Sequence, residues 1–171
     1  MIASDTEYWN RLASDIEEIV DESYEQLRNL PEATIEARPA PGEWSIKEIV
    51  GHLVDSASNN HQRFVRLQVN DGLDFPDYQQ DNDAWVRIQG YQGEVWKDLL
   101  ALWRYFNRHL ARIIRTVDQR FIDHIWVVDE DTSITIDEGS SITLGELMTD
   151  YLRHLKAHLE QIRKNFEFVE K

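Results

Sequence analysis

Residues 41–55 decide the fold, and they read PGEWSIKEIVGHLVD. Ser45 and Glu48 stand three positions apart before an apolar run. This is the spacing of a capping box, in which each side chain binds a free backbone amide at a helix start. Trp44 and Ile49 flank the box at the positions of a hydrophobic staple. The segment therefore predicts the start of a helix with one apolar side.

Three other segments repeat apolar residues at the helical spacing of three or four. The first opens with Ser4 and Glu7, a second capping box, and stops before Pro31. The last opens with Thr143 and Glu146, a third capping box. The predicted helices cover residues 4–30, 45–69, 94–117 and 143–166. Amphipathic helices of matched length bury their apolar stripes best side by side, which predicts an all-α four-helix bundle as a single domain over residues 1–171.

Two long connections separate these helices and allow a topology other than simple up-down-up-down. Residues 70–93 are polar, and a short helical turn is expected at 83–87. The second connection, 118–142, contains two short apolar runs that predict a small hairpin between the third and fourth helices. The expected strands lie at 121–128 and 133–136, on either side of a turn at 129–131.

Composition excludes several classes of function. The 171 residues include 32 acidic and 18 basic side chains, giving a formal net charge of −14. This charge argues against binding to nucleic acid and to anionic membrane surfaces. There is no cysteine, which excludes disulfides, thiol nucleophiles and cysteine-held metal clusters. No apolar run is long enough to span a membrane, and the acidic N-terminus does not resemble a signal peptide, so we expect a cytoplasmic protein.

Three of the six histidines suggest a metal site. His154 and His158 are four residues apart, so they project from one face of the fourth helix, on its apolar stripe. Burying two imidazoles is costly unless they gain partners, and a metal ion suits both. His52 lies at the edge of the apolar stripe of the second helix, and three histidines with one open position are typical of catalytic zinc. The alternative is that these are interior histidines with hydrogen-bond partners.

Residues 41–55 and 142–162 resemble the second-helix and fourth-helix signatures of the DinB/YfiT-like superfamily of metal-binding four-helix bundles. The resemblance implies an up-down-down-up bundle that is often a homodimer. It also implies a divalent metal ion, zinc or nickel, held by the matching residues His52, His154 and His158. Members of the superfamily include thiol S-transferases and isomerases that use low-molecular-weight thiols, and proteins described as metal-dependent hydrolases.

Other polar residues near these histidines are weaker candidates. Asp55 and Asp150 each lie one turn from a predicted ligand, where they would orient a histidine or act as a general base. Their alternative is that they are surface acids on an acidic protein. His109 is a candidate fourth ligand or proton donor, or simply a histidine at the rim of the core.

Aromatic and basic residues in and near the first connection complete the candidates. Trp85 and Tyr91 are placed to cover one end of a cleft, or to cap the core. Arg63, Arg66 and Arg87 suit a substrate carboxylate, which arginine binds with two parallel hydrogen bonds. The many acids of the chain favour the other interpretation of these arginines, in which they form ion pairs within the protein.

The leading hypothesis is a metal-dependent enzyme for a small-molecule substrate. It is either a hydrolase or a low-molecular-weight-thiol S-transferase, and the thiol would have to come from a small molecule because the chain has no cysteine. The first alternative is a non-enzymatic helical bundle that binds a partner or acts in stress as a dimer. The second is a metal sensor or store without turnover, with its open position closed by another side chain.

Overall fold

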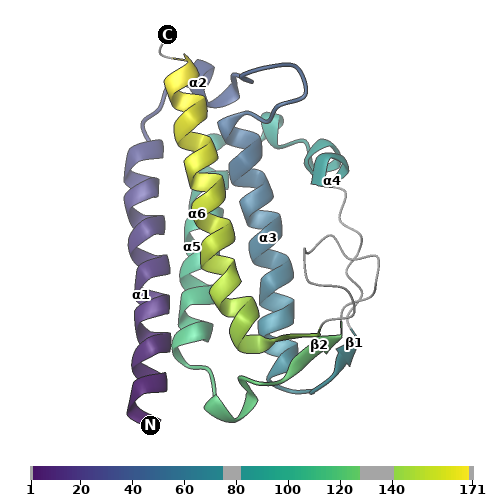
Figure 1. The fold of residues 1–171 in the computed structure, drawn as a ribbon. Coiled ribbons are helices and arrows are strands. Elements are labelled where there is room, and N and C mark those ends of the chain that lie inside the picture. The colour runs from purple at the N-terminus through teal and green to yellow at the C-terminus, as the bar shows by residue number, and fades with distance from the viewer. Residues whose placement is uncertain (1, 75–81, 128–140, 170–171) are drawn as a thin grey trace.

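Four long helices form the body of the protein. The computed structural model describes residues 2–74, 82–127 and 141–169. The long helices are α1 (Ile2–Leu27), α3 (Ile46–Leu67), α5 (Trp96–Arg115) and α6 (Leu144–Val169). In Figure 1, α1 runs up, α3 and α5 run down, and α6 runs up again. The predicted all-α bundle with up-down-down-up topology is therefore confirmed.

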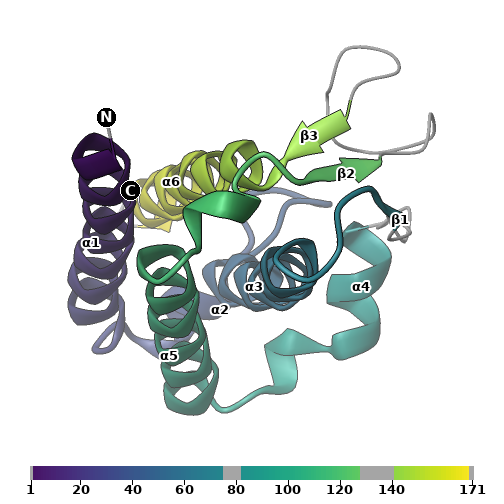
Figure 2. The same cartoon turned by 90° about the horizontal axis from the view of Figure 1, so that it is seen from below.

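The parallel direction of α3 and α5 depends on the long connection between them, which returns the chain from the lower to the upper end. This connection contains α4 (Asn82–Gln89) and the short 3-10 helix η1 (Tyr91–Gly93). The helical turn expected at 83–87 lies within α4. Figure 2 shows α4 beside α3, on the outside of the bundle.

The starts of α3 and α6 are fixed by local hydrogen bonds, as predicted. The Ser45 hydroxyl accepts from the Glu48 amide at 3.2 Å, and the Glu48 carboxylate accepts from the Ser45 amide at 2.9 Å. Before α6, the Thr143 hydroxyl accepts from the Glu146 amide at 3.2 Å, and Thr143 N donates to the Glu146 carboxylate at 2.9 Å. Both capping boxes therefore set where the helices of the candidate site begin.

The prediction was wrong at the N-terminal helix. Helix α1 begins at Ile2, so Ser4 lies inside the helix and is not its cap. The Ser-x-x-Glu pattern is local, and the same residues also fit the first turns of a helix that starts earlier. Helix α1 ends at Leu27, and a further short helix, α2 (Glu32–Glu36), follows with Pro31 at its N-cap. The sequence analysis did not predict α2.

A small three-stranded sheet lies beside the lower end of the bundle (Figure 1). It consists of β1 (Leu73–Asp74), β2 (Ile125–Val127) and β3 (Ser141–Thr143) in the order β1-β2-β3. Strand β2 lies within the first predicted strand and pairs antiparallel with β3. The prediction assigned 141–143 to a connection and helix cap, so it missed β3 as the partner. The predicted strand at 133–136 and turn at 129–131 lie outside the described residues.

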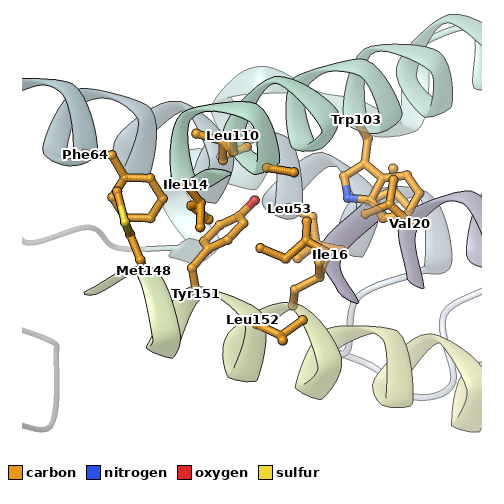
Figure 3. Close-up of a cluster of buried hydrophobic side chains, with 14 of the residues drawn as sticks. Ile16, Val20, Leu53, Phe64, Trp103, Leu110, Ile114, Met148, Tyr151 and Leu152 are labelled. Atoms are coloured by element: carbon orange, nitrogen blue, oxygen red, sulfur yellow. The ribbon is translucent and has the colours of Figure 1, made fainter. Parts of the chain in front are cut away.

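The core is apolar and is shared by all four long helices (Figure 3). A polar contact within the core joins α6 to α5, where the buried Tyr151 hydroxyl donates to Asn107 Oδ1 at 2.6 Å. Across the described part of the chain, no helix combines the length and apolarity needed to cross a membrane. The side chains labelled in Figure 3 are Ile16, Val20, Leu53, Phe64, Trp103, Leu110, Ile114, Met148, Tyr151 and Leu152.

Candidate metal centre

The antiparallel packing of α3 on α6 brings the three predicted histidines together. His52 on α3 faces His158 on α6, with ring centroids 4.7 Å apart. One turn further along α3, Ser56 lies opposite His154, one turn earlier on α6. The two helices are antiparallel, so a step of four residues forward along α3 corresponds to a step of four residues backward along α6. Each step moves the contact by about one helical turn, which keeps the two helices in register.

The three imidazoles form a compact group. His154 and His158 have ring centroids 4.5 Å apart, and His52 and His154 are 5.6 Å apart. Each ring offers one nitrogen such that the three nitrogens lie within 4.8 Å of one another. Among the described residues, no other group of three or more histidine and carboxylate side chains lies close enough together to hold one ion.

Burial keeps these imidazoles uncharged at neutral pH. His52 is only 3% exposed, and burial together with the neighbouring His158 and His154 lowers its pKa to about 3. Burial, followed by the effect of His158, lowers the pKa of His154 to about 4. The pKa of His158 is also lowered, again mainly by burial. An uncharged imidazole has a free lone pair, which is the form that binds metal ions.

Hydrogen bonds orient the two α6 histidines. His158 Nδ1 lies 2.9 Å from Gln161 Oε1, and an amide oxygen only accepts, so Nδ1 donates and Nε2 keeps its lone pair. His154 Nδ1 lies 3.4 Å from the Ser56 hydroxyl. Asn60 Nδ2 in turn donates to the Ser56 carbonyl oxygen at 2.9 Å. Partners of this kind fix the ring and tautomer of metal-binding histidines.

His52 provides the observation that tests whether an ion fits. Its Nδ1 is buried and has no hydrogen-bond partner among the described residues. An unpaired buried nitrogen is costly, and here it belongs to a ring that faces two other uncharged imidazoles. Three neutral nitrogen donors suit zinc or nickel. The residues present therefore fit a divalent ion.

Asp55 is buried, and its contacts lead away from the histidines. Its Oδ1 accepts from the Tyr91 hydroxyl at 2.6 Å and from the Gln89 side-chain amide. Burial raises its pKa, partly offset by these two hydrogen bonds. Gly51 allows the contact, because a Cβ there would collide with the Tyr91 ring. Asp55 thus ties α3 to the α4–η1 connection, and the structure shows no hydrogen bond from it to a ligand histidine.

Asp150 is a surface acid that pairs with Arg153. Arg153 Nε donates to Asp150 Oδ1 at 2.6 Å, and both side chains are exposed. The charge of Asp150 raises the pKa of His154, but burial and the effect of His158 both outweigh it. The structure brings neither Asp55 nor Asp150 into hydrogen-bond contact with the three histidines.

His109 belongs to a different group. Its ring lies 5.3 Å from that of His61, which is on the opposite side of α3, and it is exposed. Burial, followed by the effect of His109, lowers the pKa of His61. Of the two interpretations of His109, the structure does not place it at the centre as a fourth ligand, because α5 packs on the other face of α3. Its exposed ring fits the other interpretation, a histidine at the rim of the core.

The aromatic and basic candidates of the sequence analysis differ in how deeply they are buried. Tyr91 is buried against α3, whereas Trp85 is half-buried on α4. Arg63 is buried, with its guanidinium 4.4 Å from the ring centroid of Trp126. Arg66 and Arg87 are exposed. Arg63 therefore packs on an aromatic ring in the interior, whereas Arg66 and Arg87 lie at the surface.

The sequence analysis missed three residues around the centre. Gln161 lies three residues after His158, a spacing that could have identified it as a partner. Trp44 was predicted only as a staple residue, yet its ring centroid lies 5.0 Å from that of His52. Asn165 donates to the Trp44 carbonyl oxygen at 2.8 Å, a contact between distant segments that no local pattern signals.

The fold and this group of residues define a helical bundle with a three-histidine candidate metal centre. Residues 15–162 match the DinB superfamily, and the chain belongs to that superfamily. Among solved structures, it resembles YfiT from Bacillus subtilis, described as a probable metal-dependent hydrolase with an unusual four-helix bundle topology. The TM-score is 0.76 at 17% identity, over 96% of this chain and 87% of that one. No curated protein gave a significant match.

Proposed function

We propose that this protein is a metal-dependent enzyme whose ion is held by His52, His154 and His158. The observation that carries the proposal is the meeting of three uncharged imidazoles, with one nitrogen of each within 4.8 Å of the others. The unpaired buried Nδ1 of His52 supports it further. We expect the ion to be zinc or nickel, since both accept neutral imidazole ligands.

The protein's own residues prepare this centre in distinct ways. Gln161 and Ser56 hold the rings of His158 and His154, so that less reorganisation is needed when an ion binds. Three neutral ligands leave the full positive charge on the ion. When bound, the ion would supply Lewis-acid activation of a substrate atom. His52 is buried, and the low dielectric of buried surroundings strengthens the electrostatic effect of a bound charge.

Two reaction classes remain within the proposal. A hydrolase is supported by the likeness to YfiT, which is described as a probable metal-dependent hydrolase. A thiol S-transferase is supported by the ability of zinc to bind a thiolate as well as imidazole nitrogen. Since the chain contains no cysteine, the thiol would come from a small molecule.

The decisive experiment is elemental analysis of untagged protein purified without chelator. The matched sample is the variant His52→Ala/His154→Ala/His158→Ala. We expect about one zinc or nickel ion per chain in the wild type and none in the variant, as three-ligand catalytic sites bind one ion. A wild type that is empty, and stays empty when zinc and nickel are added, would contradict the proposal and favour a non-enzymatic bundle.

An enzyme is distinguished from a metal store by its open coordination position. The cobalt-substituted protein should change its absorption spectrum when azide or a small thiol is added, because an open position admits an outside ligand. A spectrum that responds to neither would indicate a closed site, as in a store or sensor.

A further inference from the structure

Trp44 lies at one end of the three-histidine group and contacts it directly. Its ring centroid is 5.0 Å from that of His52, with the two planes inclined by 44°. The indole is half-buried, so part of it is accessible. Trp44 precedes the N-cap of α3, two turns above His52, whereas Ser56 lies one turn below His52. The candidate centre therefore has an aromatic end and a polar end.

Trp44 is held from two other helices, its indole by α4 and its backbone by α6. Trp44 Nε1 donates to Asp83 Oδ1 in the first turn of α4 at 2.9 Å. The Trp44 carbonyl oxygen accepts from Asn165 Nδ2 on α6 at 2.8 Å. The Ser45–Glu48 capping box fixes the backbone immediately after it. A side chain restrained in this way loses little conformational freedom when a ligand packs against it.

We propose that Trp44 is a specificity-determining residue, which recognises an aromatic or similarly flat apolar group on the ligand of the three-histidine centre. This inference rests on the proposed metal-dependent function. The flat apolar face of an indole packs favourably on rings and on apolar groups, and such contacts contribute beyond the area they bury. The preferred ligand thus carries an apolar group near its metal-binding atom.

A purely structural role for Trp44 is the competing interpretation, and the chain provides a matched control. Trp96, at the start of α5, is also half-buried and also donates its indole N–H, to the Leu27 carbonyl oxygen at 3.3 Å. Trp96 has no ring contact with the three histidines among the described residues. A role in folding alone would give similar effects at both tryptophans, whereas ligand recognition concerns Trp44 only.

The experiment compares two thiols on the cobalt-loaded protein: 2-mercaptoethanol, and phenylmethanethiol, which adds an aromatic ring. Dissociation constants come from the thiolate-to-cobalt absorption band, and the measured quantity is their ratio. In the wild type we expect the ratio to favour phenylmethanethiol. We expect Trp44→Ala to reduce this preference about three- to tenfold, as expected for the loss of an aromatic contact. Trp44→Phe should retain most of it, and Trp96→Phe should leave it unchanged.

The variant Trp44→Gln provides a second test should Trp44→Ala fold poorly, because glutamine keeps bulk and removes the aromatic face. An unchanged ratio in either folded variant would overturn the inference. Equal weakening of both thiols would also overturn it, since Trp44 would then only position His52. If the wild type takes up no cobalt, the proposed function fails and this inference fails with it. Cobalt uptake with an unchanged ratio removes the inference alone.

Discussion

Two groups of histidines flank α3. The spacing of their rings is similar, but the number of rings and their hydrogen-bond partners differ. His52 faces α6, where its ring centroid lies 4.7 Å from His158 and 5.6 Å from His154. His61 comes nine residues later, two and a half helical turns, and so points to the opposite side, towards α5. There its ring lies 5.3 Å from that of His109.

The α6 side combines three properties that the α5 side lacks. It has a third ring, one of its rings (that of His52) is buried, and two of its rings have hydrogen-bond partners at Nδ1. His109, by contrast, is exposed. The proximity of two imidazoles is therefore not enough to indicate a metal centre. Burial and fixed ring orientation are what make three such rings a prepared set of ligands.

The largest expected effect comes from removing one ring of the α6 group. His52→Ala should weaken zinc binding at least about a hundredfold, because even the loss of an outer hydrogen-bond partner costs about 10–100-fold. Competition with a chromophoric chelator measures the affinity. His109→Ala is the control on the other side of α3, and it should bind zinc as the wild type does. Equal losses in both variants would break the distinction between the two groups.

A second effect concerns stability against pH in the metal-free protein. The folded-state pKa is about 3 for His52 and about 4 for His154, whereas an unfolded histidine titrates near 6.5. As the pH falls, the unfolded chain therefore takes up these protons first. The contribution of these uncharged histidines to the free energy of unfolding is fully present above about pH 6.5. It is lost as the pH falls towards their folded-state pKa values.

Urea unfolding at pH 7.5, 6.0 and 5.0 checks this expectation. The free energy of unfolding should fall across the series, and His52→Asn/His154→Asn should make the fall shallower. His61→Asn should change the slope less, since only one ring is replaced and it lies outside the buried group. A double variant with the wild-type slope would show that burial of the α6 group does not control its protonation.

A smaller effect is expected for the orientation of His158. Gln161→Leu keeps the size of the side chain but removes the oxygen that accepts from Nδ1. Zinc affinity should fall about tenfold, the lower end of the effect of losing such a partner. The control is Gln62→Leu, which removes an exposed glutamine that accepts from Arg66 at 3.2 Å beside His61. We expect no measurable change there, and a loss equal to that of Gln161→Leu would contradict the assigned role.

The sequence predicted the parts of the centre that depend on local spacing. The capping boxes at Ser45 and Thr143 set the two helix starts, and the four-residue step from His154 to His158 placed both rings on one face. The same local reasoning failed at Ser4, where the box-like pattern does not mark the start of α1. A local pattern identifies which residues favour a cap, and packing elsewhere decides whether the helix begins there.

Contacts between distant segments could not be predicted from local patterns in the sequence. Nothing local indicates that Asn165 donates to the Trp44 carbonyl oxygen, because this contact follows from the register of α3 on α6. His109 illustrates the same limit in the opposite direction. Its helical face was predictable, but the face of α3 on which α5 packs was not, and this packing separates it from His52.

Asp150 gives the smallest expected effect and the finest test of what controls the α6 group. Its ion pair with Arg153 is exposed, and such pairs contribute about 0–1 kcal/mol to stability. Its charge acts on His154 less than burial does. Asp150→Asn should therefore leave the unfolding free energy within about 0.5 kcal/mol and the zinc affinity within about twofold of the wild type. Thermal melting and chelator competition measure both. A tenfold loss of affinity with unchanged stability would mean that a surface charge, and not burial alone, prepares His154 for the ion, and it would make Asp150 part of the centre.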